Sequence, residues 1–148
     1  MKKLFLAFVV IVAGMTSCSK DAVTTTIDSS QPNGAFTATK TGTFVEQNQT
    51  GSAGTAQLGT DSKGTQFLKF GSDFKTNFGT GTVSVYLSTS MTFTASPGTG
   101  NPDLKLIGPV SKAGENYFKI SPAADPKFTY VILWCGTANI PFGNANVK

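Results

Sequence analysis

Apolar residues recur mainly at every second position, in short runs separated by glycine, proline, serine and asparagine. The run 82–88, for example, alternates valine or leucine with threonine, serine or tyrosine. A period of two is typical of a β-strand with one buried face, and no stretch has a convincing helical period. The pattern therefore predicts an all-β fold, an antiparallel β-sandwich of about eight to ten short strands.

The expected strands are bounded by turn residues. A hairpin is predicted for 55–58 and 65–70, joined by the glycine-containing loop 59–64. A further pair is expected at 91–95 and 104–107, on either side of the Pro/Gly-rich loop 96–102. The remaining expected strands are 41–47, 82–88, 116–120, 127–135 and 138–142.

The most apolar stretch outside the N-terminus is 128–142, which contains the single tryptophan of the chain, Trp134. Alternation places Val131, Leu133 and Cys135 on one face of this strand and Trp134 on the other. Both faces are apolar, so we expect the strand to lie centrally in a sheet. We further expect the face with Cys135 to be the inner one, with Trp134 covering an outer surface.

The first residues have the pattern of an export signal. Lys2 and Lys3 precede an apolar run, 4–13, that is too short to span a membrane. The run leads to Ser17-Cys18, and a small residue before a cysteine at this distance resembles the lipobox of bacterial lipoproteins. This resemblance implies a signal peptide at 1–17 and acylation of Cys18, as by palmitate, which anchors the chain in a lipid bilayer. The alternative is an ordinary secretory signal with an incidental cysteine.

The segment after Cys18 bears on location and on the domain boundary. Cys18-Ser19-Lys20-Asp21 resembles lipoproteins of the Bacteroidota, which implies attachment to the outer membrane, with display at the cell surface as a further alternative. Residues 18–34 are rich in Ser and Thr and have little to bury, so they are expected to form a flexible tether. The folded domain is then expected at 35–148.

Composition argues against an enzyme and against nucleic-acid binding. The chain has no histidine, which removes the common general base, the usual catalytic triads and the usual zinc ligands. Acidic residues sit singly, so we expect neither catalytic residues nor a metal site. Without Lys2 and Lys3, ten lysines stand against eight acids, a net charge of +2 instead of +4. The lysines are scattered and there is no arginine, so no nucleic-acid partner is expected.

Cys135 is the one residue of the predicted domain that is a candidate for a chemical role. If Cys18 is acylated, Cys135 has no partner within the chain for a disulfide. An odd thiol in an exported protein is a reactive group, an intermolecular partner or a buried residue. Free cysteines are among the most buried residue types, which favours a packed and unreactive thiol.

Several short motifs, in order over residues 40–148, resemble the small extracellular domain called DM-thirteen, or the electron-transfer DM domain. Two departures stand out: Gln47-Asn48-Gln49 occupies a place where members often carry a histidine, and 79–82 replaces a Gly-Pro-Asp-Leu motif. The matching motifs are Gly42-Thr43-Phe44, Phe67-Leu68-Lys69-Phe70, Val83-Ser84-Val85-Tyr86-Leu87-Ser88, Leu106-Ile107-Gly108-Pro109, Gly114-Glu115-Asn116-Tyr117, Val131-Ile132-Leu133-Trp134-Cys135 and Ile140-Pro141-Phe142-Gly143-Asn144-Ala145.

The resemblance implies a redox or electron-transfer role centred on Cys135, either as a bare thiol or as the ligand of a bound cofactor. Trp134, Tyr117, Phe142 and Gly143 are the residues expected to support it. It identifies neither the cofactor nor the redox partner. Two alternatives stay open: a non-catalytic adhesion or ligand-binding β-sandwich with Cys135 in its core, and a periplasm-facing accessory subunit.

Overall fold

The computed structural model describes residues 30–95 and 100–148, so the predicted signal peptide, Cys18 and most of the predicted tether lie outside the described residues. The described part contains eight strands, all paired antiparallel, and the all-β antiparallel class is confirmed. The strands are β1 (Thr37–Glu46), β2 (Thr55–Thr60), β3 (Gln66–Phe70), β4 (Val83–Ser88), β5 (Leu104–Val110), β6 (Asn116–Ile120), β7 (Tyr130–Cys135) and β8 (Ile140–Asn146).

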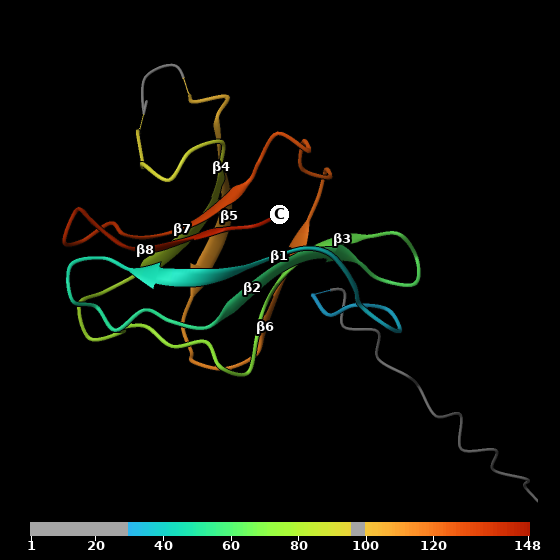
Figure 1. Ribbon diagram of the computed structural model, residues 1–148, viewed down its shortest axis with the longest axis horizontal. Helices are drawn as coiled ribbons and strands as arrows, with labels where there is room; N and C mark the ends of the chain where they lie inside the picture. The colour runs from blue at the N-terminus through green and yellow to red at the C-terminus, as the bar shows by residue number, and fades with distance from the viewer. Residues whose placement is uncertain (1–29, 96–99) are drawn as a thin grey trace, which may run out of the picture.

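The strands form one continuous sheet in the order β5-β4-β7-β8-β1-β2-β3-β6. The long strand β1 joins two layers, because its residues up to Thr43 pair with β2 and its residues from Phe44 pair with β8. In the strand order of the sheet, β8, β7, β4 and β5 follow one another on one side of β1, and β2, β3 and β6 on the other; Figure 1 labels each strand. The edge strands β5 and β6 contact each other, so the expected sandwich is a single sheet curled nearly into a barrel.

The inside of the curled sheet is a continuous hydrophobic core. Rings pack edge to face at its centre, with the centroids of Phe44 and Phe70 5.1 Å apart. β7 lies between β4 and β8, as expected for a strand with two apolar faces. Its inner side chains pack with those of β4 at 0% exposure, and the members from these two strands are Val83, Val85, Leu87, Val131, Leu133 and Cys135.

Most predicted strands are present with shifted ends. The hairpin of β2 and β3 is confirmed, with its pairing running from Ala56–Phe70 to Thr60–Gln66. β1 begins four residues before the expected start at 41, because Thr37 pairs with Thr60 at the far end of β2. β8 begins at Ile140 rather than 138 and continues to Asn146, since its later residues pair with both β7 and β1.

The prediction of a strand at 91–95 is wrong. These residues form no strand, and β5 pairs with β4 instead. Side chains here bond to nearby backbone: Ser90 Oγ accepts the N–H of Thr92 and donates to its carbonyl, and Asn101 Nδ2 donates to the carbonyl of Thr94. Such local bonds compete with a strand ladder for the same backbone groups.

Residues just before β1 pack on the rest of the domain. Asn33 donates its N–H to Asp61 Oδ2 over 3.0 Å, and its carbonyl accepts the N–H of Ser62. The Asp61 carboxylate also accepts the N–H groups of Lys63 and Thr65, each over 2.8 Å. The bond from Asn33 and those from the β2–β3 loop lower the pKa of Asp61 below its ordinary value.

No helix long and apolar enough to cross a membrane occurs within the described residues, 30–95 and 100–148.

Candidate functional site

Cys135 is the last residue of β7 and lies in the core. It is fully buried, at 0% exposure, with Val83 of β4 as its cross-strand partner and Ile140 of β8 on the other side. The period of two in β7 brings Val131 and Leu133 to the same inner face. The expectation that Cys135 faces inward and Trp134 outward is therefore confirmed.

The sulfur atom has polar contacts on one side. The backbone N–H of Ala138 lies 3.4 Å from Cys135 Sγ, within reach for donation to sulfur. Thr80 Oγ1 lies 3.7 Å from Sγ, and the Thr80 carbonyl oxygen 3.8 Å. One N–H donor, one hydroxyl that can donate or accept, and one carbonyl acceptor thus surround a thiol that otherwise packs among hydrophobic side chains.

These polar contacts come from two loops that close over the sulfur. One is the loop 79–82 before β4 and the other is the β7–β8 turn, 136–139, and both are solvent-exposed. The loops touch at Gly81, whose φ of +117° favours glycine and where an added Cβ would lie 2.6 Å from Thr137 Oγ1. Only this layer of loop separates the sulfur from solvent on that side.

The burial of Cys135 Sγ limits what the sulfur can bind. A cofactor held by Cys135 Sγ would have to displace the loop 79–82 or the β7–β8 turn, because the sulfur has no exposed surface. The residues around Sγ therefore do not fit a bound cofactor, and the arrangement suits a bare thiol. Among residues 30–95 and 100–148, His, Cys, Asp and Glu side chains form no group of three or more that could hold a metal ion.

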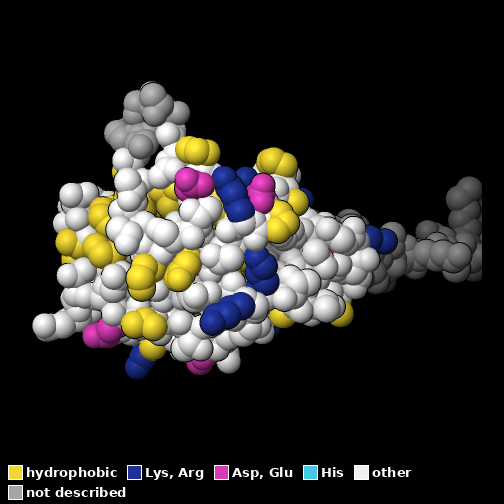
Figure 2. Space-filling view, turned by 45° about the horizontal axis from the view of Figure 1, so that its top comes forward, with side chains coloured by type: hydrophobic (Ala, Val, Ile, Leu, Met, Phe, Trp, Pro, Cys, Tyr) yellow, Lys and Arg dark blue, Asp and Glu magenta, His cyan; other side chains and the backbone are white. Residues whose placement is uncertain are grey.

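Trp134 lies on the opposite, outer face of β7. Its ring stacks on Phe93, with centroids 4.1 Å apart and planes 18° apart, and Phe93 packs edge to face against Tyr86 of β4. The partly exposed Met91 lies beside them. Figure 2 shows hydrophobic side chains in several separate places on the visible face of the molecule.

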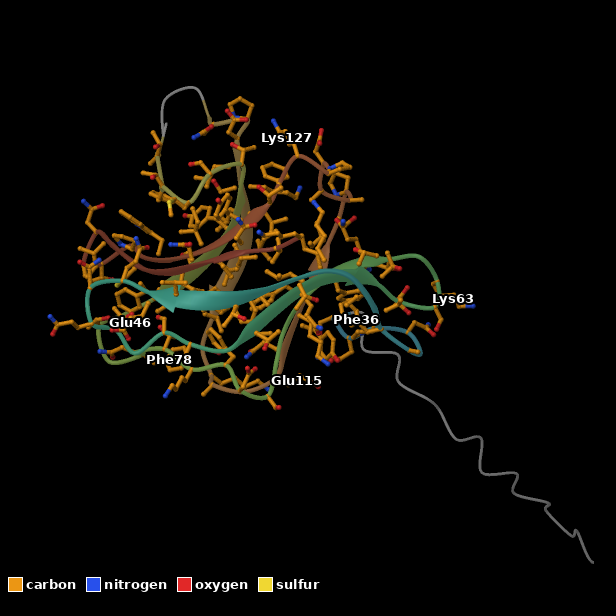
Figure 3. The ribbon with its side chains drawn as sticks, viewed as in Figure 1. Phe36, Glu46, Lys63, Phe78, Glu115 and Lys127 are labelled. Carbon is orange, nitrogen blue, oxygen red and sulfur yellow. The ribbon has the colours of Figure 1, made fainter. Side chains whose placement is uncertain are left out.

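The remaining predicted site residues fall into two places. Phe142 is in the core at 1% exposure, and the next residue of β8, Gly143, packs closely against the backbone of β1. Tyr117 of β6 lies in the other layer, where its ring contacts Phe36 and Lys69. Phe36, labelled in Figure 3, lies on the side of the molecule that carries β2, β3 and β6. The structure thus places Cys135 and Phe142 in one core, Trp134 outside it, and Tyr117 apart from both.

Sequence reasoning missed the residues that surround Cys135 and Trp134. Thr80 and Ala138 reach Sγ from loops, and neither has a pattern that marks it as a contact of sulfur. Met91 and Phe93 had a visible signal: two large apolar residues in a stretch otherwise rich in Ser and Thr. The predicted strand includes both residues, whereas Phe93 stacks on Trp134 at the outer face of β7 and Met91 lines the same pocket.

Comparison with known proteins identifies a family. A family model described as Electron transfer DM13 matches residues 43–147, which includes β2 to β8 and Cys135. No curated protein and no solved structure matches the chain. The match covers well over half of the 148 residues and agrees with the order of motifs described above. The chain belongs to the Electron transfer DM13 family.

Proposed function

We propose that this protein is a membrane-anchored lipoprotein whose domain takes part in electron transfer through the bare thiol of Cys135, without being an enzyme itself. The observation that carries the proposal is the family match over residues 43–147, because that range contains Cys135 and the family is described by electron transfer. The setting of Cys135 supports it, since the N–H of Ala138 and the hydroxyl of Thr80 reach Sγ from loops at the surface.

The proposed redox step needs the thiol to become accessible. Separation of the loop 79–82 from the β7–β8 turn would expose Sγ without unpairing β7 from β4 or β8. The exposed thiol, once deprotonated, attacks one sulfur of a disulfide in a partner protein. A mixed disulfide forms, the partner's S–S bond breaks, and the released partner thiolate takes up a proton. The partner is thus proposed to be an oxidised thiol protein.

The proposed anchor rests on the sequence. The positive start, the short apolar run 4–13 and the small residue before Cys18 support acylation of its thiol. Two or three acyl chains hold a protein stably on a bilayer, because each buried CH₂ contributes about 0.8 kcal/mol. The segment after Cys18 supports the outer membrane as the location, with the cell surface as the favoured side if Lys20 and Asp21 act as an export signal.

A second candidate function is favoured by the burial of Cys135. With 0% exposure and its place beside Val131 and Leu133, the thiol is suited to pure packing. The domain would then be a non-catalytic adhesion or ligand-binding module on the same lipid anchor. Both candidates have the same fold, so the accessibility of the sulfur separates them.

Thiol labelling of the purified full chain, folded and in urea, tests the proposal. A local opening of the loops exposes Cys135 more often than global unfolding does, so labelling of the folded protein should be faster than the global unfolding equilibrium allows. Thr80→Ala should speed it further, because this change removes the hydroxyl contact to Sγ. The Cys135→Ala chain gives the background. Labelling that occurs only through global unfolding, unchanged by Thr80→Ala, would reject the redox role and leave the packing role.

A further inference from the structure

A pocket of about 350 Å³ opens on the outer face of β7 and β8, away from the core that holds Cys135. Its walls come from three parts of the chain: the end of β1, the β4–β5 loop and the paired strands β7 and β8. Trp134 and Pro141 are cross-strand partners at its base. The complete lining is Gln47, Met91, Thr92, Phe93, Trp134 and Pro141.

The apolar side of this pocket offers surfaces on which a flat ring can pack. Phe93 and Trp134 are already stacked on each other, which holds both rings in one orientation and leaves their remaining surfaces toward the pocket. Met91 is 55% exposed, and its thioether can pack against the face or edge of a bound ring. Covering such an exposed apolar side chain with a ligand removes apolar surface from water, which favours binding.

The polar side of the pocket contains one hydrogen-bond acceptor that has no donor in the described part of the chain. Gln47 Oε1 is buried and has no hydrogen-bond partner among the described residues. A buried acceptor without a donor is costly, so a ligand that supplies the donor is favoured. Gln47 lines the pocket, and the last torsion of a glutamine side chain is broad, so a turn about it would bring the buried oxygen toward a donor in the pocket.

The lining residues also argue against two classes of ligand, charged compounds and sugars. None of the six residues is charged, so the pocket has no group to pair with an anion or a cation. Its side-chain polar groups are the amide of Gln47, the hydroxyl of Thr92 and the indole N–H of Trp134, too few for a sugar, whose hydroxyls each need a partner when buried. One apolar ring with a single donor matches the lining best.

We propose that this pocket binds a small uncharged aromatic compound that carries one hydroxyl donor, of the phenol class, with the ring against Trp134 and Met91 and the hydroxyl donating to Gln47. This site goes beyond the electron-transfer role, because it lies on the face of β7 opposite Cys135 and needs no thiol. Binding of this kind is independent of whether Cys135 reacts.

The chain reports on this site directly, because Trp134 is its single tryptophan. The full chain is titrated with 4-methylphenol while tryptophan emission is followed, with excitation at wavelengths that the ligand does not absorb. A parallel titration uses 4-methylanisole, which has the same ring but no hydroxyl donor. We expect saturable quenching by both, with 4-methylphenol binding about tenfold more tightly, the ratio that one neutral hydrogen bond supplies.

Four variants locate the binding. Gln47→Leu should remove the tenfold preference for 4-methylphenol and leave 4-methylanisole unaffected. Met91→Ala should weaken both ligands, whereas Cys135→Ala and Tyr117→Phe, which lie elsewhere, should weaken neither. The proposal is overturned if no saturable quenching occurs, if the two ligands bind equally to the unmodified chain, if Gln47→Leu leaves the preference intact, or if Met91→Ala has no effect on either ligand.

Discussion

Replacement of Cys135 by serine exchanges the buried sulfur for a hydroxyl and tests how the thiol is held. The residue is 0% exposed, so the hydroxyl has no access to water in the folded protein. The closest donor is the N–H of Ala138, at 3.4 Å from Sγ. That distance suits sulfur but already exceeds the usual 2.7–3.2 Å of an N–H···O bond.

The oxygen of serine would lie farther from Ala138 than Sγ does, because the C–O bond is shorter than the C–S bond. The same holds for the hydroxyl of Thr80, which is 3.7 Å from Sγ. The hydroxyl would thus be buried with its hydrogen bonds unmade, which costs about 1–3 kcal/mol. Cys135→Ala buries no polar atom and loses only the packing of one sulfur, so it should cost less than Cys135→Ser.

Urea unfolding of the three chains under reducing conditions measures these differences. We expect the midpoint to fall in the order wild type, Cys135→Ala, Cys135→Ser, with the slope m unchanged. A serine variant as stable as the wild type, or more stable than the alanine variant, would show that the loop 79–82 and the β7–β8 turn close around the hydroxyl. The packing described for Cys135 would then be refuted.

Three further predictions concern other parts of the chain. The carboxylate of Asp61 has a pKa below its ordinary value of 3.8, so the stability it contributes is present above 3.8 and is lost as the pH falls through the lower folded-state value. The urea midpoint of Asp61→Asn should therefore fall less steeply with acid than that of the wild type, and equal slopes would contradict this. Gly143→Ala should cost about 1–3 kcal/mol because its Cβ would lie 2.9 Å from the carbonyl oxygen of Val45, whereas thermal melts of Gly136→Ala, which meets nothing within 4 Å, should be unchanged. Cys18→Ala should release the protein from the membrane fraction or leave its precursor uncut, and unchanged fractionation and processing would reject the lipid anchor.

The sequence by itself determined the class of the fold and the central place of β7. Alternation of apolar and polar residues has a physical meaning without any tertiary information, because successive side chains of a strand point to opposite faces. The same rule put Val131, Leu133 and Cys135 on one face and Trp134 on the other. Apolar residues on both faces then required cover on both sides. The order of short motifs was also enough to indicate the family that the model match shows.

The tertiary structure alone decided the neighbours of each face. Which side of a strand faces the core depends on the partners it pairs with, and the passage of β1 from β2 to β8 curls the sheet so that Cys135 is inside. The strand expected at 91–95 had suitable residues, but side-chain bonds bind the backbone of Thr92 and Thr94 instead of a strand ladder, and Phe93 stacks on Trp134. Gln47 reaches the same pocket from a distant part of the chain. Contacts of this kind join residues far apart in sequence, so no local pattern encodes them.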